Sequence, residues 1–428
     1  MLVASLQPGE TAPEKYQNEL AAVLYSPRMK SNSCINPASG FFLLLSLVSL
    51  YATCRLAAET PQSQPKVPPQ QARDTVAARR MSHLQRGINL SGWFAQVADP
   101  KGYTREHFIS HTTPRDIALV KAMGFDHVRL SVNPQPMFRA GQADAIPQEY
   151  LDYLDQAVHT ILSNGLAVIL DVHPDSEFKN RLAKDDHLVE QLGNFWRAFA
   201  KHYAALDPNL VFFEILNEPE FEDRYRWAGI QTKLAAAIRE GASQGTIIAT
   251  GARWSDDADL VFLEPLPDAN VIYTFHFYEP HIFTHQGATW GVDFWHFEQG
   301  LVYPSTPESA AKVAALVPEA ANRLYVIRYG FERWNSARIE AEVSQVAEWA
   351  GRHQVPVTCD EFGVYRKYAD TNSRVAWLTD VRTSLERHGM GWTMWDYSGG
   401  FGVVTKTDGG TVPDGPTLGA LGLKAPGP

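Results

Sequence analysis

From residue 84 onward, short apolar runs alternate with longer segments in which apolar residues recur every three or four positions. The short runs are typical of strands buried on both faces of a parallel sheet, and the longer segments are typical of amphipathic helices. This alternation predicts an α/β fold whose strands lie near Gly87–Leu90, His127–Val132, Ala167–Val172, Val211–Leu216, Thr246–Thr250, Val271–His276, Val355–Asp360 and Gly391–Trp395.

The segments between these strands are predicted to be mainly helical, for example at Glu149–Ser163, His187–Tyr203 and Ser373–His388. Eight β/α units over roughly 340 residues fit a single (β/α)8 TIM barrel with insertions. We therefore place one catalytic-type domain at residues 84–423, after which the chain ends in Gly- and Pro-rich sequence.

One connection is too long for an ordinary βα loop. The segment Glu279–Asn335 follows the sixth predicted strand and contains Trp290, Trp295 and Trp334. Long connections at the C-terminal ends of barrel strands usually shape the substrate cleft. We therefore expect an extended loop insertion that borders the site.

The first 58 residues contain an apolar block, Phe41–Ala52, with the length of a signal-peptide core. The block is too short to span a bilayer comfortably. Met29 and Lys30 precede it, so translation from Met29 would supply the basic start that a signal peptide needs. We expect a secreted or periplasmic protein, with cleavage shortly before residue 59 and no stable membrane span in the mature chain.

Two further features belong to this N-terminal part. Tyr51-Ala52-Thr53-Cys54 partly resembles a lipoprotein box, which makes a lipid anchor at Cys54 an alternative to simple secretion. Residues 59–83 are rich in Pro, Gln and Ala and carry no periodic apolar face, which predicts an extended linker.

Composition narrows the classes of partner. With 48 acidic and 38 basic residues the chain carries a formal net charge of −10, which argues against a nucleic-acid-binding surface. Its 11 Trp and 16 Tyr suit a neutral partner that stacks on aromatic rings, such as a carbohydrate. Only three cysteines occur, so neither a disulfide framework nor a cysteine metal site is expected, and Cys359 is predicted to be a small buried hydrophobe.

Two of the predicted strands end in a glutamate. The fourth strand runs into Asn217, Glu218 and Pro219, and Pro219 cannot continue a hydrogen-bonded ladder. The seventh strand ends at Glu361. A lone glutamate in such a place is usually a surface or ion-paired carboxylate. Two at the same end of one barrel indicate acid/base and nucleophilic chemistry on a glycosidic bond.

In this region the sequence resembles glycoside hydrolase family 5, the cellulase-type retaining glycosidases of clan A. The matching motifs cover nearly the whole chain after the linker and stand in the family's order. They are R-G-I-N-L (Arg86–Leu90), H-V-R-L (His127–Leu130), L-D-V-H (Leu170–His173), L-N-E-P (Leu216–Pro219), H-F-Y (His276–Tyr278), D-E-F-G (Asp360–Gly363) and M-W-D-Y (Met394–Tyr397).

The resemblance implies roles for individual residues. Glu218 would be the general acid/base and Glu361 the nucleophile, with Arg129 and the Tyr278 hydroxyl stabilising the charged form of Glu361. Because the two glutamates end the fourth and seventh strands of one barrel, we expect their carboxyl groups to be separated by about 5–5.5 Å.

Further residues at the strand ends are implied to bind substrate or to support catalysis. Asn217 would bond the sugar 2-OH, His173 and His276 would orient the sugar and the acid, and Trp395 would form the apolar floor. The remaining candidates for contact with the sugar are Asn89, Trp93 and Trp254; core packing is the alternative for the two tryptophans.

These features predict a monomeric retaining endo-β-1,4-glucanase (cellulase) that acts on a β-glucan without a cofactor or a metal. An endo-β-1,4-mannanase and an exo-β-1,3-glucanase would share the same catalytic residues and stay open. A non-catalytic carbohydrate-binding barrel would require a lost catalytic residue. A metal-dependent enzyme would need ligands around His276, His281 and His285, where no carboxylate stands at ligand spacing.

Overall fold

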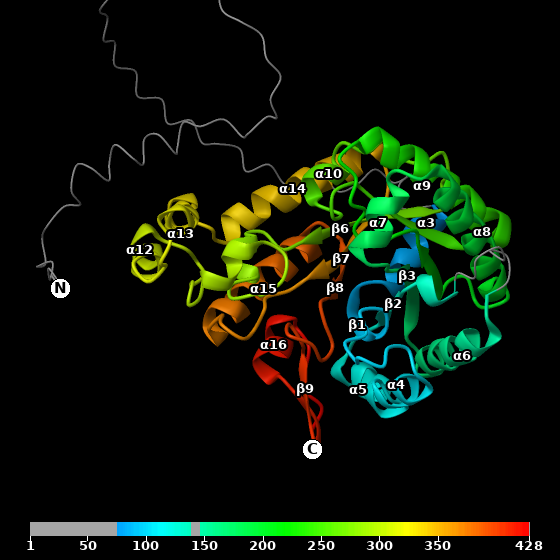
Figure 1. Ribbon diagram of the computed structural model, residues 1–428, viewed down its shortest axis with the longest axis horizontal. Helices are drawn as coiled ribbons and strands as arrows, with labels where there is room; N and C mark the ends of the chain where they lie inside the picture. The colour runs from blue at the N-terminus through cyan, green and yellow to red at the C-terminus, as the bar shows by residue number, and fades with distance from the viewer. Residues whose placement is uncertain (1–74, 138–145, 428) are drawn as a thin grey trace, which may run out of the picture. The chain divides into compact units, whose positions relative to one another are not determined.

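The computed structural model describes residues 75–137 and 146–427. Within them, eight parallel strands form a closed barrel in which each strand is hydrogen-bonded to the next and β8 returns to β1. The predicted (β/α)8 barrel is therefore confirmed (Figure 1). Its strands are β1 (Arg86–Phe94), β2 (His127–Val132), β3 (Ala167–Val172), β4 (Val211–Glu214), β5 (Thr246–Thr250), β6 (Val271–Phe277), β7 (Val357–Phe362) and β8 (Gly391–Met394).

Helices surround the barrel (Figure 1). Helix α5 shows how local sequence fixes one of them: Thr113 and Asp116 cap its start reciprocally, Pro114 occupies its first turn, and Gly124 ends it with a φ of 99°. The helices between barrel strands, apart from those of the long insertion, are α4 (Arg105–Ser110), α5 (Pro114–Met123), α6 (Gln148–Ser163), α7 (Ser176–Leu182), α8 (Asp186–Tyr203), α9 (Arg224–Gly241), α10 (Asp257–Leu260), α14 (Ser336–His353) and α15 (Thr371–Arg387), with a short 3₁₀ turn η2 (Gln135–Met137).

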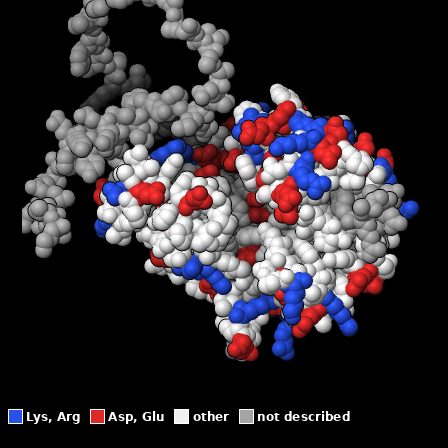
Figure 2. All heavy atoms as spheres, in the orientation of Figure 1, with Lys and Arg blue, Asp and Glu red and all other residues white. Residues whose placement is uncertain are grey.

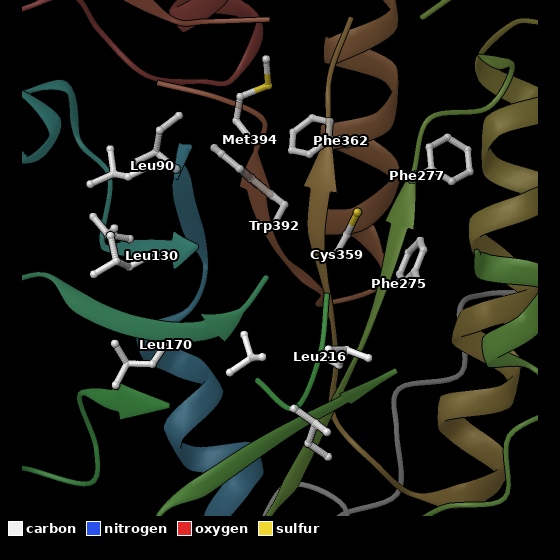
Figure 3. Packing of buried hydrophobic residues seen from close by; sticks show 14 of the residues in the cluster. Leu90, Leu130, Leu170, Leu216, Phe275, Phe277, Cys359, Phe362, Trp392 and Met394 are labelled. Carbon is white, nitrogen blue, oxygen red and sulfur yellow. The ribbon is translucent and has the colours of Figure 1, made fainter. Parts of the chain in front are cut away.

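The strand register places like residues side by side around the barrel. Leu90, Leu130 and Leu170 are paired across β1, β2 and β3, and Figure 3 shows their side chains on the same side of the sheet. All three are buried, with at most 1% of their surface exposed. Because side chains alternate along a strand, the neighbours of these leucines point into the barrel, where Asn89 and Arg129 lie opposite each other.

A short helix packs against residues at the start of the barrel strands. Helix α3 (Val76–Arg80) and the 3₁₀ turn η1 (Met81–His83) bury Ala77 together with strand residues such as Ile169 and Phe212. The Arg80 side chain donates to Thr246 Oγ1 at the start of β5, at 2.9 Å. Residues 75–83 thus form part of the folded body, and the prediction of an extended linker as far as residue 83 is wrong for these nine positions.

The long segment after β6 is folded. It consists of α11 (His281–Thr284), a 3₁₀ turn η3 (Asp293–Phe297), α12 (Pro307–Ala314) and α13 (Ala320–Glu332). Gly330 of α13 lies so close to α12 that a Cβ there would be 2.5 Å from the Ala310 methyl, so the two helices pack tightly. The expected loop insertion is therefore largely helical, and Figure 1 shows α12 and α13 outside the ring of barrel helices.

The C-terminal residues form a hairpin and a helix that the sequence pattern did not indicate. Strands β9 (Val404–Thr407) and β10 (Gly410–Pro413) pair antiparallel, and α16 (Gly415–Ala420) packs on α15.

The remaining predictions concern single residues and the N-terminal part. Cys359 is fully buried, as predicted. The expectations for Met29, the apolar block and Cys54 lie outside the described residues. None of the helices in the described part is long and apolar enough to cross a bilayer.

Candidate active site

The two glutamates lie close together where the strands end. Glu218 stands four residues after β4, and its side chain is 27% exposed; Glu361 lies on β7, and its side chain is 5% exposed. One carboxylate oxygen of each, together with a ring nitrogen of His276, fits in a group whose members all lie within 4.8 Å of one another. Figure 2 shows a groove across the molecule with acidic side chains, in red, at its bottom.

An irregularity in β7 determines where Glu361 lies. Phe275 of β6 pairs with Cys359, and the next residue of β6, His276, pairs with Glu361, so Asp360 is an extra residue in β7. Such a bulge redirects the side chain that follows it. Here it places Glu361 directly opposite His276, at the end of the barrel where Glu218 lies.

Two donors hold the Glu361 carboxylate. Arg129 Nη1 donates to Oε1 at 2.7 Å, and the Tyr278 hydroxyl donates to Oε2 at 2.9 Å. Burial raises the pKa of Glu361, and the electrostatic interactions with the His276 ring and the Arg129 guanidinium oppose this rise. The geometry agrees with the expected partners, since both stabilise the ionised carboxylate.

The guanidinium of Arg129 uses all its donors on buried side chains. Nε and Nη2 bind the two oxygens of Glu214, each at 2.7 Å. Nη1 also reaches Asn89 Oδ1, and Nη2 reaches Asn217 Oδ1, both at 2.9 Å. Asp171 Oδ2 lies 3.1 Å from Nη2. Because the planar guanidinium is held by these partners on both sides, Nη1 can donate to Glu361 from only one direction.

Glu214 and Asp171, which pair with Arg129, were not among the residues predicted from the sequence. Each is a charged residue inside an otherwise apolar strand run. A charge in such a run indicates a buried, paired carboxylate, and this was the available signal in the sequence. Burial raises the pKa of Glu214, opposed by Arg129. Burial also raises the pKa of Asp171 to about 6, again opposed by Arg129.

A second chain of hydrogen bonds orients His173. Burial and the charge of Arg129 lower the pKa of His173 to about 3, so its ring is neutral. Nδ1 faces Asp171 Oδ2 at 2.8 Å and is assigned the hydrogen, and Nε2 accepts from Asn217 Nδ2 at 3.1 Å. The ring stacks on Trp395 with a centroid distance of 5.9 Å and an interplanar angle of 17°.

Strained backbone surrounds Glu218. Glu218 has a φ of 43°, and Arg253, Trp254 and Ser255 after β5 have φ values of 51°, 58° and 56°. These values are unusual for residues with a side chain, and such outliers gather at functional sites. The two segments are joined, because the Trp254 amide donates to the Pro219 carbonyl at 2.9 Å.

His276 and Trp254 complete the surroundings of Glu218. His276 Nδ1 lies 3.0 Å from Glu218 Oε1 and 3.5 Å from Glu361 Oε2, so the imidazole lies between the two acids. Burial lowers the pKa of His276 to about 4. Trp254 is 55% exposed, as a residue that contacts a ligand would be.

Two of the candidate residues do not face the cleft. Asn89 is fully buried, accepts from Arg129 and donates to the Asp360 carbonyl at 2.9 Å, so it supports the arginine. Trp93 is 5% exposed, and its indole donates to the Phe108 carbonyl at 2.8 Å. The suggestion that Trp93 stacks on sugar is therefore corrected: its ring is part of the core.

Of the three histidines considered as metal ligands, His281 and His285 stack on each other at a centroid distance of 5.3 Å. His281 and His285 stack on Trp295, with centroid distances of 5.8 and 4.8 Å. Within the described ranges, the one group with metal-ligand geometry is the pair of glutamates with His276, which is the candidate active site itself.

A closed parallel barrel that carries two neighbouring glutamates at its C-terminal end, one held by an arginine and a tyrosine, defines the class of glycoside hydrolases. The family follows from comparison with known proteins. Residues 86–400 match the model of the cellulase family, glycosyl hydrolase family 5. The chain belongs to that family, as the sequence motifs indicated.

Similar proteins include several named endoglucanases. Endoglucanase C of Acetivibrio thermocellus is 27% identical over 323 residues, which cover 74% of this chain and 92% of that protein. Endoglucanase 3 of Fibrobacter succinogenes is 27% identical over 344 residues, covering 76% of this chain and 51% of that protein. The crystal structure of endoglucanase Cel5A from Thermotoga maritima has a TM-score of 0.66 and 26% identity, and covers 80% of this chain and 98% of that chain.

Proposed function

We propose that this glycoside hydrolase is a retaining endo-β-1,4-glucanase in which Glu218 is the general acid/base and Glu361 the nucleophile. The main support is the separation of the two carboxylates, whose nearest oxygens lie within 4.8 Å. Retaining enzymes hold their carboxyl groups about 5–5.5 Å apart, whereas inverting enzymes need about 6.5–9.5 Å to admit a water.

The proposed reaction has two steps. In the first, a Glu361 oxygen attacks the anomeric carbon, the glycosidic C–O bond breaks, and Glu218 gives its proton to the leaving oxygen. In the second, Glu218 takes a proton from a water, whose oxygen attacks the same carbon and releases Glu361 as a carboxylate. Arg129 and Tyr278 favour the ionised Glu361 that starts the cycle, and the partial exposure of Glu218 suits exchange of protons with the leaving group and water.

Neighbouring residues would bind the sugar at the cleavage point. Asn217 gives one amide hydrogen to His173, which leaves the second for the sugar 2-OH. Trp395, held against His173, would form the apolar floor under the ring, and Trp254 on the rim would contact the chain on the side of Glu218.

The choice of β-1,4-glucan rests on relatives. Those named endoglucanases match three quarters of the chain, whereas a glucan 1,3-beta-glucosidase of Blumeria graminis is 28% identical over 174 residues and matches 31% of it. A structure of Thermotoga maritima Cel5A in complex with mannotriose keeps a mannanase as the second candidate. Reducing-sugar assays on carboxymethylcellulose, mixed-linkage glucan, mannan and laminarin separate these activities.

The variants Glu218→Gln and Glu361→Gln test the two roles. With an aryl β-cellobioside whose leaving group needs no protonation, the Glu218 variant should still form a glycosyl-enzyme, visible by mass spectrometry. The Glu361 variant should form none. Both should lose at least about 10³-fold in kcat on polymeric glucan.

The exposed neighbour Glu222 provides the control, since Glu222→Gln removes a carboxylate near Glu218 and should leave kcat unchanged. Near-normal turnover by Glu361→Gln would refute the nucleophile assignment.

The enzyme should also remain active in EDTA. If EDTA abolished activity and one divalent ion restored it, the metal-dependent alternative would be favoured. We further propose that the enzyme is exported and acts as a monomer.

A further inference from the structure

The insertion between β6 and β7 exposes an unusual amount of apolar surface. Eight of the fourteen large apolar side chains that are exposed in the described residues fall between positions 290 and 331. They include Trp290 and Tyr325, at 48% and 45% exposure. A concentration of exposed apolar groups in one insertion indicates a binding surface, whereas scattered ones need no explanation.

Aromatic rings connect this surface to the candidate active site. Tyr278, which donates to Glu361, contacts His285 at a centroid distance of 5.0 Å, and His285 stacks on Trp295 at 4.8 Å. Phe294 lies edge-on to Trp295 at 6.5 Å and stacks on Tyr325 of α13 at 4.3 Å, with an angle of 2° between the rings. The rings thus run without interruption from the cleavage point out to α13.

The backbone fixes these rings in place. The Trp295 carbonyl accepts from the Gly287 amide at 2.7 Å. Gly291 has a φ of 78°, and a Cβ there would lie 2.4 Å from the Trp295 ring, so only glycine allows this approach. The Phe294–Tyr325 stack in turn joins η3 to α13. The surface is preformed, which lowers the entropy cost of binding.

The chemistry of the surface favours a neutral, flat ligand. Aromatic rings present apolar faces, and the faces of β-linked glucose units carry C–H groups while their hydroxyls point outward, so sugar rings can stack on such side chains. Figure 2 shows mostly uncharged side chains on the wall of the groove nearest to α13. A polymer held at Glu218 and Glu361 also extends beyond the cleavage point, toward surfaces that adjoin the groove.

We propose that Trp295, Phe294 and Tyr325 form a distal binding site for the β-glucan chain, in addition to the residues around the cleavage point. This inference rests on the proposed function, and it deepens it: the insertion would confer a preference for long chains over short oligosaccharides. The site would contribute to binding of the polymer and not to the chemical steps.

The test compares long and short substrates in Tyr325→Ala and Phe294→Ala. For hydroxyethylcellulose, KM should rise about three- to tenfold with kcat unchanged, because one aromatic contact is lost. For an aryl β-cellobioside, which is too short to reach α13, both constants should stay as in the wild type. Tyr225→Ala is the matched control, since Tyr225 is 90% exposed on α9 and lies outside the insertion.

Affinity electrophoresis in gels that contain hydroxyethylcellulose provides a readout that does not need turnover. Tyr325→Ala should be retarded less than the wild type and the control. Unchanged retardation and KM in folded variants, or equal losses on both substrates, would overturn the inference. So would a wild-type dimer that Tyr325→Ala turns into a monomer, which would make the surface a self-association interface. If retardation falls while the wild type cleaves no β-glucan, the binding site stands and the proposed function fails.

Discussion

At the scale of single residues, the candidate site depends on how Arg129 is held. Glu214 binds two nitrogens of the guanidinium from one side, and Asn89 and Asn217 accept from it at 2.9 Å. Since these partners are buried, the guanidinium cannot turn away from Glu361. Glu361 therefore keeps a fixed charged donor even though its own burial raises its pKa.

The second donor to Glu361 gives a prediction about pH dependence. Tyr278→Phe removes a hydrogen bond that stabilises the ionised carboxylate, so the pKa of Glu361 should rise further. Because Glu361 acts as the carboxylate, the acidic limb of the kcat/KM profile should move to higher pH, by about one unit. The profile measured with an aryl β-cellobioside checks this.

Tyr329→Phe is the control for this prediction. It also removes a hydrogen bond of a tyrosine hydroxyl, to the Val302 carbonyl at 2.7 Å, but in the insertion. It should lower the melting temperature without moving the acidic limb. An unshifted limb in Tyr278→Phe would mean that the Tyr278 hydroxyl does not contribute to the charge state of Glu361.

The two glutamates and Arg129 could be predicted from the sequence, whereas the buried carboxylates that hold Arg129 could not. Glu218 and Glu361 follow apolar strand runs, and the barrel rule places strand ends at the site. Glu214 and Asp171 lie within such runs, where alternation alone does not tell whether a carboxylate is paired. Their role depends on the one arginine that reaches both, and that contact joins strands separated in the sequence.

At the scale of elements, the barrel strands were predictable and the insertion was not. Three of the eight strands have the predicted bounds, and the others differ at their ends, as where β4 stops at Glu214 before Leu216. Helix α12 begins at Pro307 after Thr306, a capping box whose third position is Ser309 in place of the usual glutamate. This weak start signal of α12, and the start of α13 after Glu319 without a side-chain cap, explain why the segment looked like a loop.

The insertion also contains a buried acid without a partner. Glu298 is fully buried, and neither of its carboxyl oxygens has a hydrogen-bond partner among the described residues. Burial raises its pKa from 4.5 to about 8. Between these two values the folded chain keeps the proton and the unfolded chain gives it up, so the free energy of unfolding falls as pH rises from about 4.5 to about 8.

We expect Glu298→Gln to remove this pH dependence. At pH 5 the variant and the wild type should have similar stability, because both side chains are neutral. At pH 8 the variant should be more stable by about 4 kcal/mol. Thermal denaturation at both values measures the difference, with Glu190→Gln, whose side chain is 78% exposed, as a control. Equal stability of Glu298→Gln and wild type at pH 8 would show that Glu298 finds a partner.

At the scale of the whole molecule, the closed barrel brings the ends of β4 and β7 to one groove. Eight repeats of one pattern made the barrel predictable, while the packing of α3 against the barrel was hidden by the Pro-rich sequence before it. The groove crosses the face of the molecule with acidic residues at its bottom (Figure 2), a shape that suits attack within a long chain. The insertion adds surface beside the groove.

If Glu218 and Glu361 act by double displacement, the first product keeps the anomeric configuration of the substrate. Two inversions at the anomeric carbon restore the original configuration, whereas a single attack by water inverts it. Proton NMR during hydrolysis of a β-1,4-linked oligosaccharide records the anomeric signals before mutarotation. Double displacement predicts that the β-anomer appears first; an α-anomer as the first product would refute the roles proposed for Glu218 and Glu361.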